Sequence, residues 1–180
     1  MMSEREYLYA LALDCGFSHV GNLDVRTLRV YREVRDSCEE NKCRSYRSNW
    51  ACPPGCGTLA ECEQQIRRYP RGLILQSTGT LEDSLDYEAM ERIARDHGKH
   101  LDAFRERIQS LYPSCLMLGA GPCTRCTACT YPHEPCRFPQ QRLSSMEAMG
   151  LLVSEVCKDN KLPYYYGPNT LTYIGCVLLP

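Results

Sequence analysis

The sequence predicts a single sheet domain of the α/β or α+β class, with flanking helices and two cysteine-rich loops. Segments of strand length alternate along the chain with segments whose apolar residues recur at helical spacing. The chain has 180 residues, of which 43% are hydrophobic and 24% are charged, so it can bury one sizeable core. No linker or low-complexity tract divides it. We therefore expect one domain over residues 1–180.

Helices are predicted at four places. A Ser or Thr followed three residues later by Glu forms a capping box, which satisfies free backbone amides at a helix start, and this pattern occurs at Ser3, Thr58 and Ser144. Over residues 83–112 the apolar residues alternate steps of three and four, as on one face of a long helix. His97 falls on that face, so we expect a packed core histidine rather than a metal ligand. The four predicted helices span residues 3–15, 58–69 and 83–112 and a segment that starts at Ser144 and includes Cys157 in its apolar face.

Strands are predicted where short apolar runs are bounded by glycines or other turn residues. The third of these runs ends in glycines directly before the densest group of cysteines, so that group follows a strand end. Residues 27–34 are basic and alternating, and they fit either a strand or a helix. The four predicted strands are "FSHVGNLDV" (17–25), "GLILQSTG" (72–79), "SCLMLGAG" (114–121) and "TLTYIGCVLL" (170–179).

Thirteen cysteines are several times ordinary usage, and an odd number cannot all pair as internal disulfides. The first residues, "MMSEREYLYALALDCGF", lack the basic start and small-residue cleavage pattern of a secretory signal. We therefore expect a reducing, cytoplasmic compartment, in which thiols persist as free thiols or metal ligands. Four cysteines lie in core-like runs and are expected to pack as small apolar side chains: Cys15, Cys115, Cys157 and Cys176.

Charge and hydropathy argue against two classes of partner. The net charge is −1 with both signs interspersed, which provides no long-range attraction for nucleic acid. No apolar run approaches the roughly 20 residues that span a bilayer. We expect neither a nucleic-acid nor a membrane partner.

The most specific motif is "GPCTRCTACTYPHEPCRFP", residues 121–139. It places Cys123, Cys126 and Cys129 with two residues between successive cysteines, and Cys136 after six further residues, next to prolines. Bacterial ferredoxins bind a 4Fe-4S cluster with a similar run of cysteines at two-residue gaps. Zinc sites more often use two separated pairs. We predict a 4Fe-4S cluster here, with a zinc site and redox or structural thiols as alternatives.

A second cysteine-rich stretch, "CRSYRSNWACPPGCGTLAEC", spans residues 43–62. We predict a second 4Fe-4S cluster on Cys43, Cys52, Cys56 and Cys62, with Cys38 competing for the corner assigned to Cys43. Cys62 would lie at a helix start, where the helix dipole favours an anion; alternatively it only packs in the core. Arginines near both stretches fit charge compensation of two anionic clusters: Arg44, Arg47, Arg125, Arg137 and Arg142.

Several stretches carry a family resemblance: "CRSYRSNWACPP", "CTRCTACTYPHEPCRFP", "SSMEAMGLLV" and "LTYIGCVLL". Together they resemble the predicted metal-binding proteins catalogued as domain of unknown function 2284. The resemblance covers the chain from about Cys38 onward. It implies an iron–sulfur or other metal-binding protein of anaerobic metabolism and leaves the reaction open.

Two classes of function fit these observations. In the first, the protein is an electron-transfer or redox accessory module, with saturated clusters and a redox protein as partner. In the second, it is an enzyme or sulfur-handling protein in which one cluster keeps an open iron site for a small-molecule substrate. A zinc-stabilised interaction protein is a more distant alternative. Whether the protein is an enzyme is left open.

Overall fold

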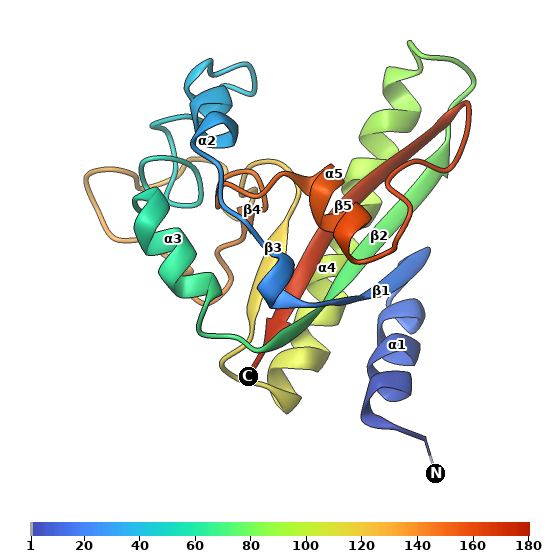
Figure 1. Ribbon diagram of the computed structural model, residues 1–180. Helices are drawn as coiled ribbons and strands as arrows, with labels where there is room; N and C mark the ends of the chain where they lie inside the picture. The colour runs from blue at the N-terminus through green and yellow to red at the C-terminus, as the bar shows by residue number, and fades with distance from the viewer. Residues whose placement is uncertain (1) are drawn as a thin grey trace.

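The computed structural model describes residues 2–180, which form an α+β fold of five α-helices, one short 3-10 helix and a five-stranded mixed sheet (Figure 1). The strand order is β1-β2-β5-β3-β4, and every neighbouring pair is antiparallel except β3 and β4. This pairing decides between the two predicted classes in favour of α+β. The strands are β1 (His19–Leu23), β2 (Arg71–Thr80), β3 (Leu116–Gly119), β4 (Ser144–Ser145) and β5 (Thr170–Leu179). The helices are α1 (Glu4–Asp14), η1 (Val25–Thr27), α2 (Arg32–Glu39), α3 (Leu59–Ile66), α4 (Tyr87–Leu111) and α5 (Val153–Asp159).

The two longest strands, β2 and β5, lie side by side at the centre of the sheet. Their register runs from Arg71 opposite Leu179 to Thr80 opposite Thr170. Residues 72–77 of β2 are all buried, because helices cover both faces of the sheet. The buried strand predicted over residues 72–79 is therefore confirmed as β2, and the strand predicted over residues 170–179 is β5, of which residues 174–179 are buried.

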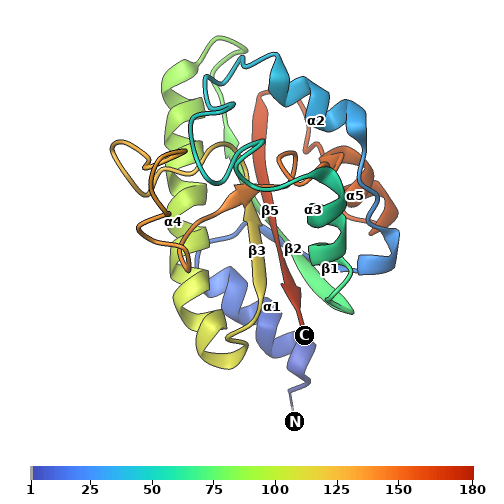
Figure 2. The same ribbon diagram turned by 90° about the vertical axis from the view of Figure 1, so that its left-hand side faces the viewer.

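Each face of the sheet has its own core. Figure 2 shows α4 on one side of the sheet and α3 and α5 on the other. On the α4 side, Leu75 packs with Phe104 and with side chains of α1. On the other side, Ile74 packs with Ile66 of α3 and with Met149. Ile74 and Leu75 point to opposite faces because side chains alternate along a strand.

The two capping boxes nearest the N-terminus are confirmed. Ser3 and Thr58 each accept a hydrogen bond from the backbone amide three residues on, and Glu6 and Glu61 accept in return from the two cap amides. The long predicted helix is also confirmed as α4, which starts after Asp86 rather than at residue 83. Within residues 2–180, none of the helices combines the length and apolarity needed to cross a membrane.

The helix predicted to start at Ser144 is wrong. Ser144 and Ser145 instead form β4, in which Ser144 pairs with Leu118 of β3. The Ser145 hydroxyl accepts from the Ala148 amide at 3.0 Å and so stabilises a turn. Gly150 then adopts a φ of +83°, which ends the turn, and α5 begins only at Val153. The Ser-x-x-Glu signature at Ser144 therefore starts no helix, because strand pairing and a left-handed glycine prevent helix growth, and the neighbouring Ser145 caps the turn instead.

Residues 27–34, which fit either a strand or a helix by sequence, contain one β-bridge and the start of a helix. Val30 forms an isolated antiparallel bridge with Leu151, and α2 follows from Arg32. None of the α2 residues is buried, so the apolar periodicity that normally marks a helix is missing from its sequence. Its connection to the core comes from Arg35, described below.

Two long loops, residues 40–58 and residues 120–143, carry seven of the thirteen cysteines. The first loop lies between α2, which carries Cys38, and α3, which carries Cys62. The loops lie side by side near β4 (Figures 1 and 2). The Trp50 indole N–H donates to the Glu134 carbonyl at 3.0 Å, and its ring meets Tyr131 edge-on at 4.9 Å. The fold thus brings together two stretches that are separated by about a third of the sequence.

Candidate metal centre

The four downstream cysteines surround one small cavity. Cys123, Cys126, Cys129 and Cys136 are all half-buried and line a space of about 20 Å³, together with Trp50 and other residues of both loops. A space of that size holds about one water molecule. The sequence spacing therefore gathers four thiols around a common point, and a larger occupant would require the loop to widen.

Hydrogen bonds within the downstream loop hold this arrangement. The Thr130 hydroxyl donates to the Pro135 carbonyl at 2.8 Å, and the Arg137 guanidinium donates to the Ala128 carbonyl at 2.9 Å. Arg125 is anchored outside the loop by an ion pair with Asp102 of α4. These bonds use the loop's own side chains, so the loop keeps its shape without a helix or a strand.

The upstream cysteines do not share a single cavity. Cys38, Cys43 and Cys52 line a space of about 230 Å³ beside Glu147. Cys43 is exposed, Cys38 belongs to the last turn of α2, and Cys52 is buried. Cys38 and Cys43, which compete for one corner in the sequence analysis, thus both lie next to Cys52.

Cys56 and Cys62 form a separate pair that adjoins that cavity through Ala148, one of its lining residues. Cys62 lies in the first turn of α3 with a side chain that is 1% exposed, and its sulfur accepts from Arg35 Nη1 at 3.4 Å. The Cys56 thiol is 3.5 Å from the Ala148 carbonyl. A hydrogen bond from the Cys56 thiol, together with the positive charge of Arg35, lowers the pKa of Cys62 to about 7. The same bond and burial raise the pKa of Cys56.

Arg35, whose position beside the upstream cysteines was not predicted from the sequence, binds three segments of this region. Besides Cys62, its guanidinium donates to the Ala148 carbonyl at 3.0 Å and to the Gly57 carbonyl at 2.7 Å. It therefore joins α2, the upstream loop and the turn after β4. A charged residue in a polar helix gave no signal of this role, because its partners are remote in the chain.

The two groups of cysteines adjoin one another. Burial raises the pKa of the Cys52 thiol. Cys52 lines the same cavity as Gly121 and Pro122, the two residues directly before Cys123. Cys123 belongs to the downstream group, so Cys52 lies next to the start of that group.

The arginines predicted to compensate charge have different positions. Arg125 and Arg142 line the downstream cavity, whereas Arg137 binds within its own loop. In the upstream loop, the Arg47 guanidinium stacks over the Tyr46 ring at 5.4 Å. Arg44 adopts a φ of +59° in that loop.

The cysteines expected to be structural are apolar contacts of the two cores. Cys157 and Cys176 are fully buried, and Cys15 and Cys115 are half-buried against the core on the α4 side. His97 is 2% exposed, which confirms that it is a core histidine. All thirteen cysteines are free thiols.

The downstream donor set consists of four thiols around one cavity. Within residues 2–180, no group of three or more His, Cys, Asp or Glu side chains lies close enough together to hold one metal ion. A cubane binds each thiolate at a different iron, so its four cysteines surround a shared space. The downstream cysteines have this arrangement, and they would hold the group through thiolate bonds.

Comparison with known proteins gives one result. A family model described as a predicted metal-binding protein, DUF2284, matches residues 21–179. The searches of curated proteins and of solved structures gave no match. Since the family model covers most of the sequence, the chain belongs to the DUF2284 family of predicted metal-binding proteins.

Proposed function

We propose that the protein is an iron–sulfur protein with a 4Fe-4S cluster on Cys123, Cys126, Cys129 and Cys136. The observation that carries the proposal is the position of these four thiols around one cavity in a loop stabilised by its own side chains. Membership in a family of predicted metal-binding proteins supports it independently. A bound cluster would supply reversible one-electron chemistry.

A second cluster on the upstream cysteines is part of the proposal, with a revised ligand set. The sequence alone predicts Cys43, Cys52, Cys56 and Cys62 as the ligands. Cys38 lines the same cavity as Cys43 and Cys52, and Cys56 follows one turn later with its amide donating to the Cys52 carbonyl at 3.1 Å. The Cys62 sulfur is instead bound to Arg35 in the core. These positions favour Cys38, Cys43, Cys52 and Cys56 as ligands.

The proposed activity is electron transfer, as a cytoplasmic redox module of anaerobic metabolism with a redox protein as partner. Its support is the adjacency of the two cysteine groups through Cys52 and Cys123. Exposed Cys43 and the half-buried downstream thiols would bring the clusters near the surface, where a partner can approach.

A second candidate is an enzyme or sulfur-handling protein with an open iron site. A cavity beside Cys56 favours it, because a substrate there would adjoin the upstream ligands. Saturated clusters should give an electron paramagnetic resonance signal that cyanide leaves unchanged. An open iron should bind cyanide and shift the signal.

The test of the cofactor is purification without oxygen, followed by iron and sulfide analysis. We expect a brown protein with broad visible absorption that bleaches with dithionite and about four irons per cluster. Cys126→Ser should remove the downstream iron, whereas Cys157→Ala, a core thiol, should keep it and lose about 1 kcal/mol of stability. A colourless protein holding stoichiometric zinc would contradict the proposal and favour the zinc alternative.

A further inference from the structure

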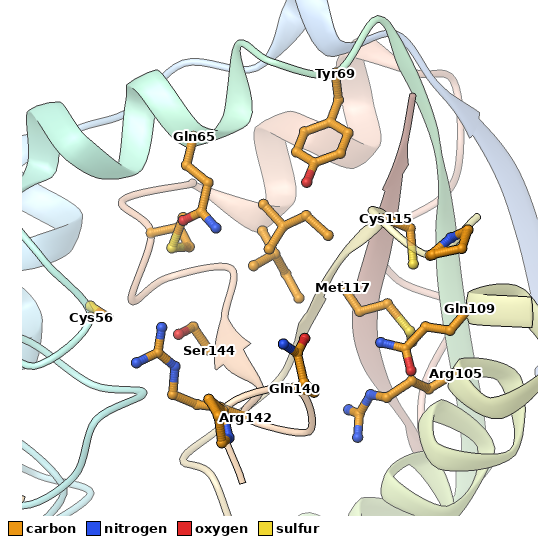
Figure 3. Close-up of a pocket in the computed structure, with 15 residues that line it drawn as sticks. Cys56, Gln65, Tyr69, Arg105, Gln109, Cys115, Met117, Gln140, Arg142 and Ser144 are labelled. Carbon is orange, nitrogen blue, oxygen red and sulfur yellow. The ribbon is translucent and has the colours of Figure 1, made fainter. Parts of the chain in front are cut away.

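A third cavity, separate from that of the four downstream cysteines and from that of Cys38, Cys43 and Cys52, lies between α3, α4, β3 and the segment before β4. It has a volume of about 190 Å³ (Figure 3). Its polar lining consists mainly of hydrogen-bond donors, and no Asp or Glu belongs to its lining in the described part of the chain. The donors used below are Arg105, Arg142, Gln65, Gln109, Gln140 and Ser144.

Arg105 of α4 is the unusual member of this lining. It is 5% exposed and lies on the apolar stripe of the helix, between Phe104 and Ile108. Its Nη1 donates to Asp102 at 3.3 Å, but Asp102 also pairs with Arg125. Its Nη2 is buried and has no hydrogen-bond partner among the described residues. A guanidinium stays charged in proteins, so this buried N–H group calls for an acceptor.

Arg142 supplies a second positive charge from a different element. It is exposed, and it also lines the cavity of the downstream cysteines. Figure 3 shows Arg105 and Gln109 entering from α4, Arg142 from the segment before β4, and Gln140 between them. Burial raises the pKa of the Cys115 thiol in this cavity, which keeps that thiol uncharged at neutral pH. The cavity therefore has an excess of positive charge.

We propose that this cavity binds a small oxyanion of the sulfate, sulfite or phosphate type. Guanidinium groups match the oxygens of such anions, and the glutamine amides and the serine hydroxyl add further donors. The volume is below the roughly 300 Å³ at which pockets for larger organic ligands begin. Because Cys56 lines the same cavity, the anion would adjoin a proposed cluster ligand. The inference rests on the proposed function only for that proximity.

The test is anion binding by the anaerobically purified holoprotein, measured by calorimetry with sodium sulfate, sodium sulfite and sodium phosphate against chloride at equal ionic strength. We expect saturable binding of at least one of these oxyanions and none of chloride. Arg142→Gln should weaken it about tenfold, since one charge-assisted bond is lost. Arg95→Gln, an exposed arginine elsewhere on α4, should leave it unchanged.

Arg105→Gln should abolish binding, and circular dichroism would show whether this buried variant folds. If it does not fold, Arg142→Gln and Gln140→Ala decide the question because both positions are exposed. Equal affinity in the wild type and in both of those variants, or no binding of any oxyanion, would overturn the inference. Iron content is measured on the same samples. A protein with full iron content that binds no oxyanion would contradict only the oxyanion site. A protein that binds an oxyanion but contains no iron would contradict only the proposed iron–sulfur function.

Discussion

At the scale of single residues, His97 is a histidine that the fold keeps uncharged. Its Nδ1 shares the Ser77 hydroxyl with His100 at 2.9 Å and 3.0 Å, respectively, and its ring lies against Phe17 and Tyr173. Burial, with a smaller contribution from the charge of His100, lowers the pKa of His97 to about 4. The charged form is therefore tolerated in the unfolded chain but not in the core.

This shift predicts acid destabilisation. The unfolded chain takes up a proton near pH 6.5, but the folded protein does so only near pH 4, so stability falls as pH falls between these values. The slope is about 1.4 kcal/mol per pH unit, for a total of about 3 kcal/mol. Urea unfolding at several pH values checks it, with His97→Gln expected to flatten this part of the profile. An equal slope in both proteins would refute this assignment.

The choice between Cys38 and Cys62 is also a question of single residues. We expect Cys38→Ala to lose about half the iron, because it removes a proposed upstream ligand. Cys62→Ala should keep full iron and lose about 1–2 kcal/mol of unfolding free energy, because a buried sulfur and its bond with Arg35 are removed. Iron per protein and urea unfolding measure both. The reverse result would restore the ligand set assigned from sequence.

At the scale of elements, sequence patterns predicted the parts of the fold that depend on neighbours in the chain. The capping boxes at Ser3 and Thr58 succeed because donor and acceptor are three residues apart. The identical signature at Ser144 fails because Leu118, remote in sequence, recruits that residue into β4. The short helix α2 stayed ambiguous because it buries none of its own residues.

The same distinction applies to the site. The gathering of the four downstream thiols could be predicted from local spacing, because one loop places them around one cavity. The positions of the upstream thiols could not, because the separation of Cys38 from Cys62 depends on Arg35 and on the packing of α3. Arg105 is visible in retrospect as a charge on an apolar helix stripe, but its unpartnered nitrogen is a property of the folded chain.

Two glycines in different elements give a matched prediction. Gly150 has a φ of +83°, and a Cβ atom there would lie 2.5 Å from a Leu59 methyl carbon of α3. Gly98 lies inside α4, and a Cβ atom there would meet nothing within 4 Å. We expect Gly150→Ala to cost about 1–3 kcal/mol and Gly98→Ala to add about 0.5–1 kcal/mol. Urea unfolding at pH 7 measures both, and a neutral Gly150→Ala would show that the turn can change its backbone.

At the scale of the whole molecule, the sheet separates two regions. The β1–β2 side and α1 form a compact support, while both cysteine loops gather beside β4 at the other edge (Figure 1). Cys52 shares a cavity there with Pro122, which directly precedes Cys123, although Cys52 and Cys123 are far apart in the chain. Loss of one cluster should therefore disturb the other more than it disturbs the distant core around α1.

Because Trp50 contacts the downstream loop, its fluorescence should report whether that loop binds a cluster. Trp50 is the single tryptophan of the chain, and it lines the cavity of the four downstream cysteines. An iron–sulfur chromophore absorbs where indole emits, so a nearby cluster should quench the fluorescence. Reconstitution of the apoprotein with iron and sulfide should dim Trp50 in step with cluster assembly, and Cys126→Ser should stay bright. Cluster insertion at one loop could thus be timed without any added label.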